Sequence, residues 1–233
     1  MPVGPLINAT ATFIGGLVGA SLGRFIPDIL KRKLPLTFGL VAFSLGIKMV
    51  IGMHNKTGVV LALLIGVIIG EMLQIERIIK NIATKAKKPL ARISKANSSD
   101  TDDTMNELIT VIVLFCASAF GIIGAMSESM SGDPSMLVLK SILDGVTAAI
   151  FGASLGIMVA FIAIPQLIVL LLMFTIGRFI LPLTTPLLIQ DFEALGGIIL
   201  IATGFNLLQI RSFSVSNMLP GLVLVMPLCA LLG

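Results

Sequence analysis

The sequence has little charge and few of the residues on which most enzymes depend. Asp, Glu, Lys and Arg make up 12% of the 233 residues, whereas a soluble domain is about 25% charged. There is one histidine, His54, and the two cysteines, Cys116 and Cys229, lie inside apolar runs. The sequence shows no metal-spaced His/Cys/Glu cluster, no nucleophile elbow and no phosphate-binding loop. We therefore expect no enzyme activity, no cofactor and no disulfide. The sequence does not indicate which metal ion, if any, the protein binds.

The chain also lacks Trp and Tyr, which usually mark the two membrane interfaces. No basic segment precedes the first apolar run, so we expect no cleavable signal peptide. Hydrophobic residues make up 56% of the chain, and its mean hydropathy is +1.07. Several apolar runs of about 18 to 20 residues are long enough to cross a bilayer. The predicted fold class is all-α, a polytopic membrane helix bundle in the lipid bilayer.

Eight apolar segments are the predicted membrane spans: 6–26, 35–53, 59–73, 108–126, 136–161, 165–182, 196–210 and 219–232. Together they form a single transmembrane domain, 1–233, with four parts. The parts are a first three-span half (1–74), a basic linker (75–106), a central two-helix hairpin (107–162) and a second three-span half (163–233). Glycines spaced by four, such as Gly15 and Gly19, predict close helix packing, either within one chain or in a homo-oligomer.

The net charge of +4 comes mainly from two short loops, so we expect no nucleic-acid partner. The loops 24–33 and 77–95 hold 11 of the 16 Lys and Arg residues, and the bends 127–135 and 183–193 hold only acidic charges. Because positively charged loops remain in the cytoplasm, this pattern predicts eight spans with both termini outside.

The two flanking halves contain similar segments. FGLVAFSLGIK (38–48) is similar to LGGIILIATGFN (195–206), and GVVLALLIGVIIG (58–70) is similar to GLVLVMPLCALLG (221–233). Under the eight-span topology, these segments would form an inverted repeat of spans 1–3 and 6–8, an arrangement common in transporters. The alternative is chance similarity among glycine-rich apolar helices.

Two charged residues in the fifth span are the leading candidates for a functional site. Lys140 and Asp144 are four residues apart and so lie on one helix face. Charges in a lipid-crossing helix are costly and usually face a bundle interior or a wet cavity. The functional interpretation is an ion or proton site with Asp144 as ligand or proton carrier. The structural alternative is an ion pair near the outer interface that satisfies itself.

Other polar residues complete the candidate list. Neutral oxygen ligands to a hard cation, or simply hydrogen bonds between helices, could come from Asn8, Thr10, Thr12, Thr203, Asn206 and Asn217. Glu128 and Asp133 lie in the acidic bend, where they could raise the local cation concentration at an outer mouth.

Three stretches carry a resemblance to a known family: GPLINATATFIGGLVGASLG, IVLFCASAFGIIGAMSESMSGDPSMLVLKSILDG, and ATGFNLLQI with NMLPGLVLVMP. They resemble the domain-of-unknown-function family of prokaryotic integral membrane proteins typified by YqgA and YdfK. The resemblance covers nearly the whole chain. It implies a multi-pass protein of a prokaryotic plasma membrane, with a label of sodium channel or pump. It assigns no role to any residue.

The predicted function is passive or secondary transport of a small ion, sodium first and the proton next, between the two halves. One alternative is a membrane scaffold or regulator that works through the basic loop 77–95. Another is an exporter of a small organic solute. A transporter should lose flux in Asp144→Asn with its fold intact, whereas a scaffold should tolerate this change.

Overall fold

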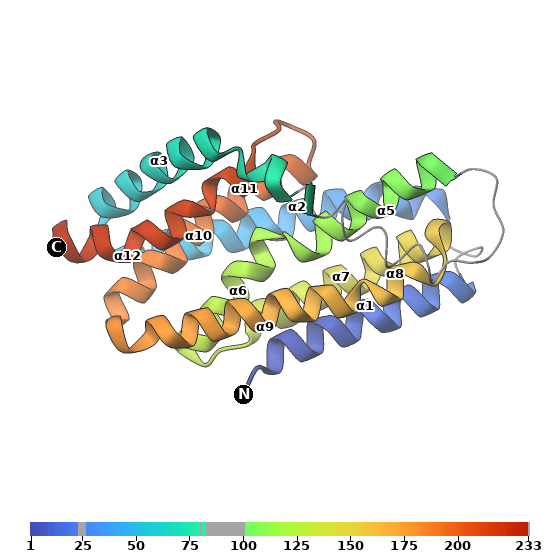
Figure 1. Cartoon of the computed structure of the whole chain (residues 1–233), viewed down its shortest axis with the longest axis horizontal. Coiled ribbons are helices and arrows are strands. Elements are labelled where there is room, and N and C mark those ends of the chain that lie inside the picture. The colour runs from blue at the N-terminus through green and yellow to red at the C-terminus, as the bar shows by residue number, and fades with distance from the viewer. Residues whose placement is uncertain (23–26, 80, 83–100, 233) are drawn as a thin grey trace.

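The structure is a computed structural model that describes residues 1–22, 27–79, 81–82 and 101–232. Within these residues the regular structure is entirely helical, which confirms the all-α prediction (Figure 1). The elements are α1 Val3–Leu22, α2 Asp28–Ile51, α3 Lys56–Leu73, α5 Thr101–Cys116, α6 Ala119–Ser131, α7 Ser135–Leu155, α8 Met158–Phe161, α9 Ala163–Ile180, the 3-10 helix η2 Leu181–Leu183, α10 Pro186–Leu207, α11 Val215–Met218 and α12 Pro220–Leu232.

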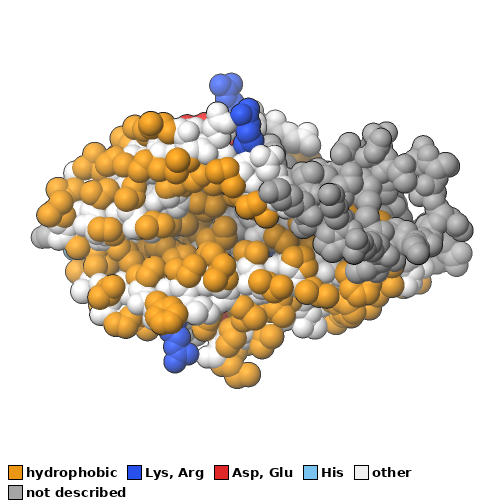
Figure 2. Space-filling model, in the orientation of Figure 1, with side chains coloured by type: hydrophobic (Ala, Val, Ile, Leu, Met, Phe, Trp, Pro, Cys, Tyr) orange, Lys and Arg blue, Asp and Glu red, His pale blue; other side chains and the backbone are white. Residues whose placement is uncertain are grey.

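Eight stretches of the described chain are long and apolar enough to cross a membrane, as the sequence predicts. They are Val3–Leu22, Lys33–Ile51, Lys56–Leu73, Val111–Ser131, Ser135–Leu155, Met158–Leu183, Pro186–Leu207 and Val215–Leu232. Large hydrophobic side chains remain exposed on nearly all of these helices. Figure 2 shows such side chains over most of the described part of one face. This surface suits contact with lipid, because a helix satisfies its own backbone hydrogen bonds there.

Two predicted spans are not the single continuous helices that were expected. The fourth was expected to be one helix over 108–126, but it breaks between α5 and α6, where Ser118 is extended (φ −66°, ψ 121°). The fifth was expected to run over 136–161, but α7 ends at Leu155 because Gly156 has φ 70°, a left-handed value that favours glycine. The short α8 then leads into α9 and belongs to the sixth span.

Two predicted bends are shorter than expected. The bend over 127–135 is mostly helical, because α6 continues to Ser131 and ends at Gly132 in the left-handed region, φ 79°. The bend over 183–193 is also largely helical, because α10 begins at Pro186 instead of residue 196. Thr185 caps this helix by accepting a hydrogen bond from the Leu188 N–H, and proline is favoured in the first turn. Of the acidic residues assigned to loops, Glu128, Asp191 and Glu193 therefore lie on membrane-spanning helices, whereas Asp133 lies in the turn between α6 and α7.

Close helix contacts depend on glycine at two interfaces. On α1, a Cβ added to Gly15 would overlap the Gly145 carbonyl of α7, and α1 and α7 run parallel. The α2–α10 pair is antiparallel, and a Cβ on Gly197 would lie 2.7 Å from the Gly46 carbonyl oxygen. Backbones this close give extensive van der Waals contact, which drives helix association in lipid.

The helices form two groups that meet along α6 and α10. One group contains α1 and α5 to α9, and the other contains α2, α3 and α10 to α12. Figure 1 shows α3 and α12 along one edge of the bundle and α1 along the opposite edge. A hydrophobic core joins the groups, with Ile123 of α6 packed among Phe192, Leu195 and Ile199 of α10. The pairs α2–α10 and α3–α12 are those that the proposed repeat relates, but the repeat itself stays a prediction.

Both termini lie at the same end of the bundle. The Asp191 carboxylate of α10 accepts a 2.8 Å hydrogen bond from the Asn55 N–H in the α2–α3 turn. The Asn55 side chain in turn donates to the Cys229 carbonyl near the end of α12. At the start of α1, the Gly4 N–H donates to Glu128 near the end of α6. This arrangement fits an even number of crossings. Which side of a membrane this end faces stays a prediction.

Candidate functional site

A buried ion pair lies at the centre of the first helix group. The Lys140 ammonium contacts Asp144 Oδ2 within α7, as the four-residue spacing predicts. The side chains are 2% and 13% exposed, respectively. The Lys140 side chain is almost fully enclosed, so it does not extend to the protein surface as an ion pair at the outer interface would allow. Removing two charges from water costs several kcal/mol per ion, so this pair requires further polar contacts.

Two amide side chains from other helices provide those contacts. Asn8 of α1 donates from Nδ2 to Asp144 Oδ2 over 3.0 Å. Gln166 of α9 donates from Nε2 to the same oxygen over 2.7 Å and to Asn8 Oδ1 over 2.7 Å. Both amides are fully buried. Three donors from three helices thus converge on one carboxylate oxygen, while Asp144 Oδ1 accepts no hydrogen bond from the described residues.

The cluster also contains two buried oxygens without hydrogen-bond partners. They are Oγ1 of Thr12, one helical turn after Asn8, and Oε1 of Gln166. Both residues are fully buried. A buried polar atom without a partner costs about 1 to 3 kcal/mol, so each such atom calls for an explanation. A bound water or another hydrogen-bond donor beside each oxygen would satisfy it.

The broken fourth span lies beside the pair. Gly121 of α6 leaves room for the lysine, since a Cβ there would lie 3.0 Å from Lys140 Cε. Cys116, at the end of α5, lies within electrostatic range of both Lys140 and Asp144. The interruption between α5 and α6 therefore falls next to the charged residues. Discontinuous membrane helices place unpaired backbone groups near a site in many transporters.

The structure brings Asn8, Lys140 and Asp144 together, but not the other two asparagines. Asn206, at the end of α10, exchanges two hydrogen bonds with the backbone of Phe213 and fixes the following loop. Asn217 of α11 accepts a 2.9 Å hydrogen bond from the Glu76 N–H after α3. Each amide hydrogen-bonds to the backbone of a connection near one end of the bundle. Their expected role as ligands beside Asp144 does not fit these positions.

The two acidic residues of the predicted outer mouth also have separate positions. Glu128 is 4% exposed and accepts the Gly4 N–H through both carboxylate oxygens at 3.1 Å, so it stabilises the start of α1. Asp133 is exposed in the α6–α7 turn and accepts the Ser135 hydroxyl and N–H. These hydrogen bonds lower the pKa of Asp133, the hydroxyl most strongly. Of the two, Asp133 alone remains at a surface.

Sequence reasoning missed Gln166, whereas Thr12 was among the predicted neutral ligands. Gln166 was detectable as a lone amide near the start of an apolar run, IAIPQLIVLLL. Thr12 lies four residues after Asn8 and so shares its helix face. Asp191, 1% exposed, was also missed because its segment was assigned to a loop. Asp191 accepts the N–H groups of His54 and Asn55 and holds the start of α3.

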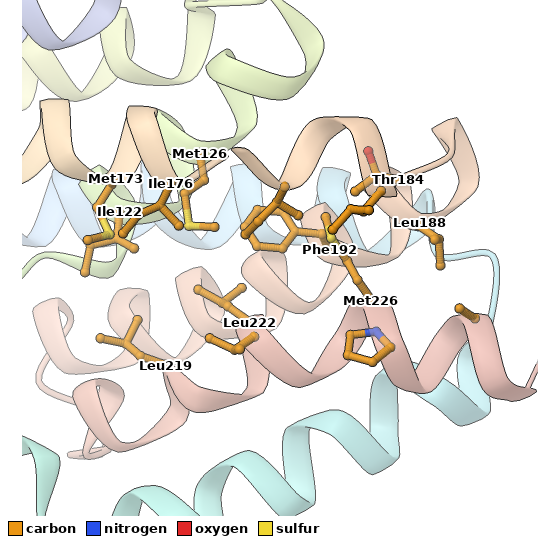
Figure 3. A pocket seen from close by; sticks show the side chains of 15 residues that line it. Ile122, Met126, Met173, Ile176, Thr184, Leu188, Phe192, Leu219, Leu222 and Met226 are labelled. Atoms are coloured by element: carbon orange, nitrogen blue, oxygen red, sulfur yellow. The ribbon is translucent and has the colours of Figure 1, made fainter. Parts of the chain in front are cut away.

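A large apolar pocket lies between the two helix groups, apart from the Lys140–Asp144 pair. It has a volume of about 680 Å³ and lies between α6, α9, α10 and α12 (Figure 3). Thr184 is the one polar side chain among its lining residues in the described part of the chain. Ile122 and Met126 lie on one side of the pocket and Leu219 and Leu222 on the other. An ion would find no charged partner there among the described residues.

The helices, their lipid-suited surface and the buried charged cluster define a polytopic α-helical membrane protein. Its residues 3–230 match the family model described as "Protein of unknown function (DUF554)", and the chain belongs to this family. It is 44% identical over 230 residues to "Uncharacterized protein YqgA" of Escherichia coli (strain K12), covering 99% of this chain and 97% of that protein. It is 24% identical over 226 residues to "Uncharacterized membrane protein YdfK" of Bacillus subtilis (strain 168), covering 95% and 93%. No solved structure matches the chain.

Proposed function

We propose that this protein transports a small ion across a prokaryotic plasma membrane and that Asp144 carries the ion. The observation that carries the proposal is the convergence of Asn8, Lys140 and Gln166 on one oxygen of a buried carboxylate. Ionisable groups inside membrane bundles usually mark ion pathways or proton relays. Helix association does not require the pair, since α1 and α7 already pack through glycine.

The proton is the ion that this arrangement suits best. Asp144 already has the Lys140 ammonium as its counter-ion, so a metal cation at the same oxygen would meet a positive charge. Asn8 and Gln166 direct N–H groups, not oxygens, toward the carboxylate. Among the described residues, no group of three or more His, Cys, Asp or Glu side chains could hold a metal ion. Nothing in this geometry favours sodium.

The relay would combine the pair with the unpartnered oxygens beside it. When Asp144 takes up a proton, it becomes neutral and its attraction to Lys140 falls. Bound water at Thr12 and Gln166 would pass protons to and from the pair. The junction of two helix groups beside a large apolar pocket would allow one group to move against the other.

Flux in proteoliposomes tests this proposal. The wild type should dissipate a pH gradient, reported by an enclosed dye, at a rate that does not depend on sodium or potassium at constant ionic strength. Lys140→Met should slow this flux, because without the ammonium the buried carboxylate is favoured in its neutral form and keeps its proton. Protein-free liposomes set the baseline. A wild type at baseline for protons and for both metal ions would contradict transport.

The scaffold alternative makes the opposite prediction. It expects no flux and depends on the basic loop 77–95, most of which lies outside the described residues. Neutralising the lysines and arginines of that loop should leave flux unchanged if the protein is a transporter. If the protein is a scaffold or regulator, the same change should abolish the function that it performs through this loop.

A further inference from the structure

A second, polar pocket lies between the two helix groups, away from the Lys140–Asp144 pair. It has a volume of about 270 Å³ and is formed by α2, α6, α7, α10 and the α6–α7 turn. It is located at the end of the bundle that holds both termini, where α2 ends and α10 begins. The lining includes Lys48, Asp133 and Glu193 together with serine hydroxyls and an amide. Proton transport through Asp144 does not use this pocket.

Charges of both signs face this pocket without pairing. Lys48 forms no hydrogen bond or ion pair with any described residue, although its charge contributes to lowering the pKa of Asp133, after the larger effect of Ser135. Glu193 accepts a 2.5 Å hydrogen bond from the Ser127 hydroxyl through Oε1. Asp133 accepts from Ser135. The ammonium and the two carboxylates thus line one pocket, and Lys48 forms an ion pair with neither of them in the described chain.

The mixed charge of this lining selects among ligand classes. A metal ion is disfavoured, because the two carboxylates do not gather with a third ligand of this kind in the described chain and an ammonium shares the pocket. An anion would meet two carboxylates, and a simple amine would leave Lys48 without a partner. A molecule with an ammonium group and a carboxylate could bridge Glu193 and Lys48 at the same time. Serine hydroxyls and Gln190 would bind its remaining polar atoms.

We infer that this pocket binds a small zwitterionic solute of the amino-acid type, with its carboxylate at Lys48 and its ammonium at Glu193 and Asp133. The pocket touches α7 at Met136 and Leu139, directly before Lys140. Binding of the solute stands without the proposed proton transport. A role for the solute as the transported substrate, driven by protons through Asp144, rests on the proposed function.

Thermal unfolding of the purified chain in detergent tests the binding. Glycine, alanine and serine should raise the unfolding temperature, since a ligand that binds only the folded state stabilises it. Methylamine and acetate at the same concentrations, each with one of the two charges, should not. Lys48→Met and Glu193→Gln should each weaken alanine binding by about ten- to a hundredfold, the usual effect of losing one charged hydrogen bond. Lys56→Met, an exposed lysine outside the pocket, is the matched control and should bind alanine as the wild type does.

Three results would overturn the inference. They are no stabilisation by any of the zwitterions, equal stabilisation by methylamine alone, and unchanged alanine binding in both pocket variants. The proposed function fails separately: if alanine binds but proteoliposomes show no proton flux either with or without alanine, the solute site stands and proton transport does not. If protons flow and no zwitterion binds, the reverse holds. Asp144→Asn should leave alanine binding unchanged.

Discussion

Gln166 donates a 2.7 Å hydrogen bond to Asn8, 158 positions earlier in the chain. The same nitrogen donates to Asp144, so one buried amide joins helices α1, α7 and α9. An amide with both N–H groups committed in this way fixes the orientation of both partners. The position of the carboxylate therefore depends on side chains from three separate membrane spans.

Replacing this amide should cost stability as well as flux. Gln166→Leu removes two hydrogen bonds and leaves Asn8 Oδ1 buried without a donor, so we expect a loss of about 1 to 3 kcal/mol in the free energy of unfolding. Thr175→Val, on the lipid-exposed face of the same helix, should change it by less than about 0.5 kcal/mol. Unfolding in detergent measures both variants. Equal effects would mean that the network contributes nothing specific.

The ion pair should show strong energetic coupling. Lys140→Met leaves Asp144 buried without its counter-ion, and loss of one partner of a buried pair costs about 3 to 5 kcal/mol. Adding Asp144→Asn should recover at least about 1 kcal/mol, because the double variant no longer contains an ionisable group that is buried without its counter-ion. A double-mutant cycle by unfolding in detergent gives the coupling. If the losses of the two single variants simply add in the double variant, the contact is contradicted. Lys48→Met combined with Asp144→Asn is the control, and its two losses in the free energy of unfolding should add.

The close approach of α1 to α7 should not tolerate a side chain. Gly15→Ala would place a Cβ against the Gly145 carbonyl, separate the helices and move Asn8 away from Asp144. We expect a loss of about 1 to 3 kcal/mol, typical of overpacking. At Gly52 a Cβ would lie 3.5 Å from the nearest atom, so Gly52→Ala is the matched control and should be nearly neutral. Unfolding of the two variants in detergent, measured side by side, tests this difference in the free energy of unfolding.

Glu128 should prove structural although its sequence position suggested an outer mouth. Glu128→Gln keeps the side-chain shape but removes the negative charge at the start of α1, which should cost about 1 kcal/mol. Proton flux per folded molecule should remain at the wild-type rate, because this residue does not contact Lys140 or Asp144. A loss of proton flux in Glu128→Gln as large as that in Lys140→Met would instead place Glu128 in the pathway.

The pH dependence of the α6–α7 turn follows from Asp133. Its folded pKa is lowered, so its contribution to stability is present above the unfolded pKa and is lost as pH falls through the folded pKa. The contribution should be small because the group is exposed. Ser135→Ala should raise the pKa of Asp133, which an NMR titration of its carboxyl carbon would detect. An unchanged pKa would exclude the Ser135 hydroxyl as the main cause.

The sequence predicted the class, the eight spans and the central pair, because long apolar runs and intramembrane charges are strong signals. It did not predict the break between α5 and α6, since VLFCASAFG contains no proline and reads as one helix. It also placed Asn206 and Asn217 beside Asp144, because an asparagine that fixes a turn has no local signature that distinguishes it from a ligand. Partners such as Gln166 depend on which helices pack together, and a single sequence does not give that packing.

The most direct test of the account is the initial rate of proton flux in proteoliposomes that contain equal amounts of wild type, Asp144→Asn and Glu71→Gln. Asp144→Asn should fall to the rate of protein-free liposomes while it remains folded, because an amide cannot take up and release the proton. Glu71→Gln, at an exposed carboxylate near the end of α3 and outside the cluster, should transport at the wild-type rate. Wild-type flux in Asp144→Asn would contradict the central claim that this buried carboxylate carries the ion.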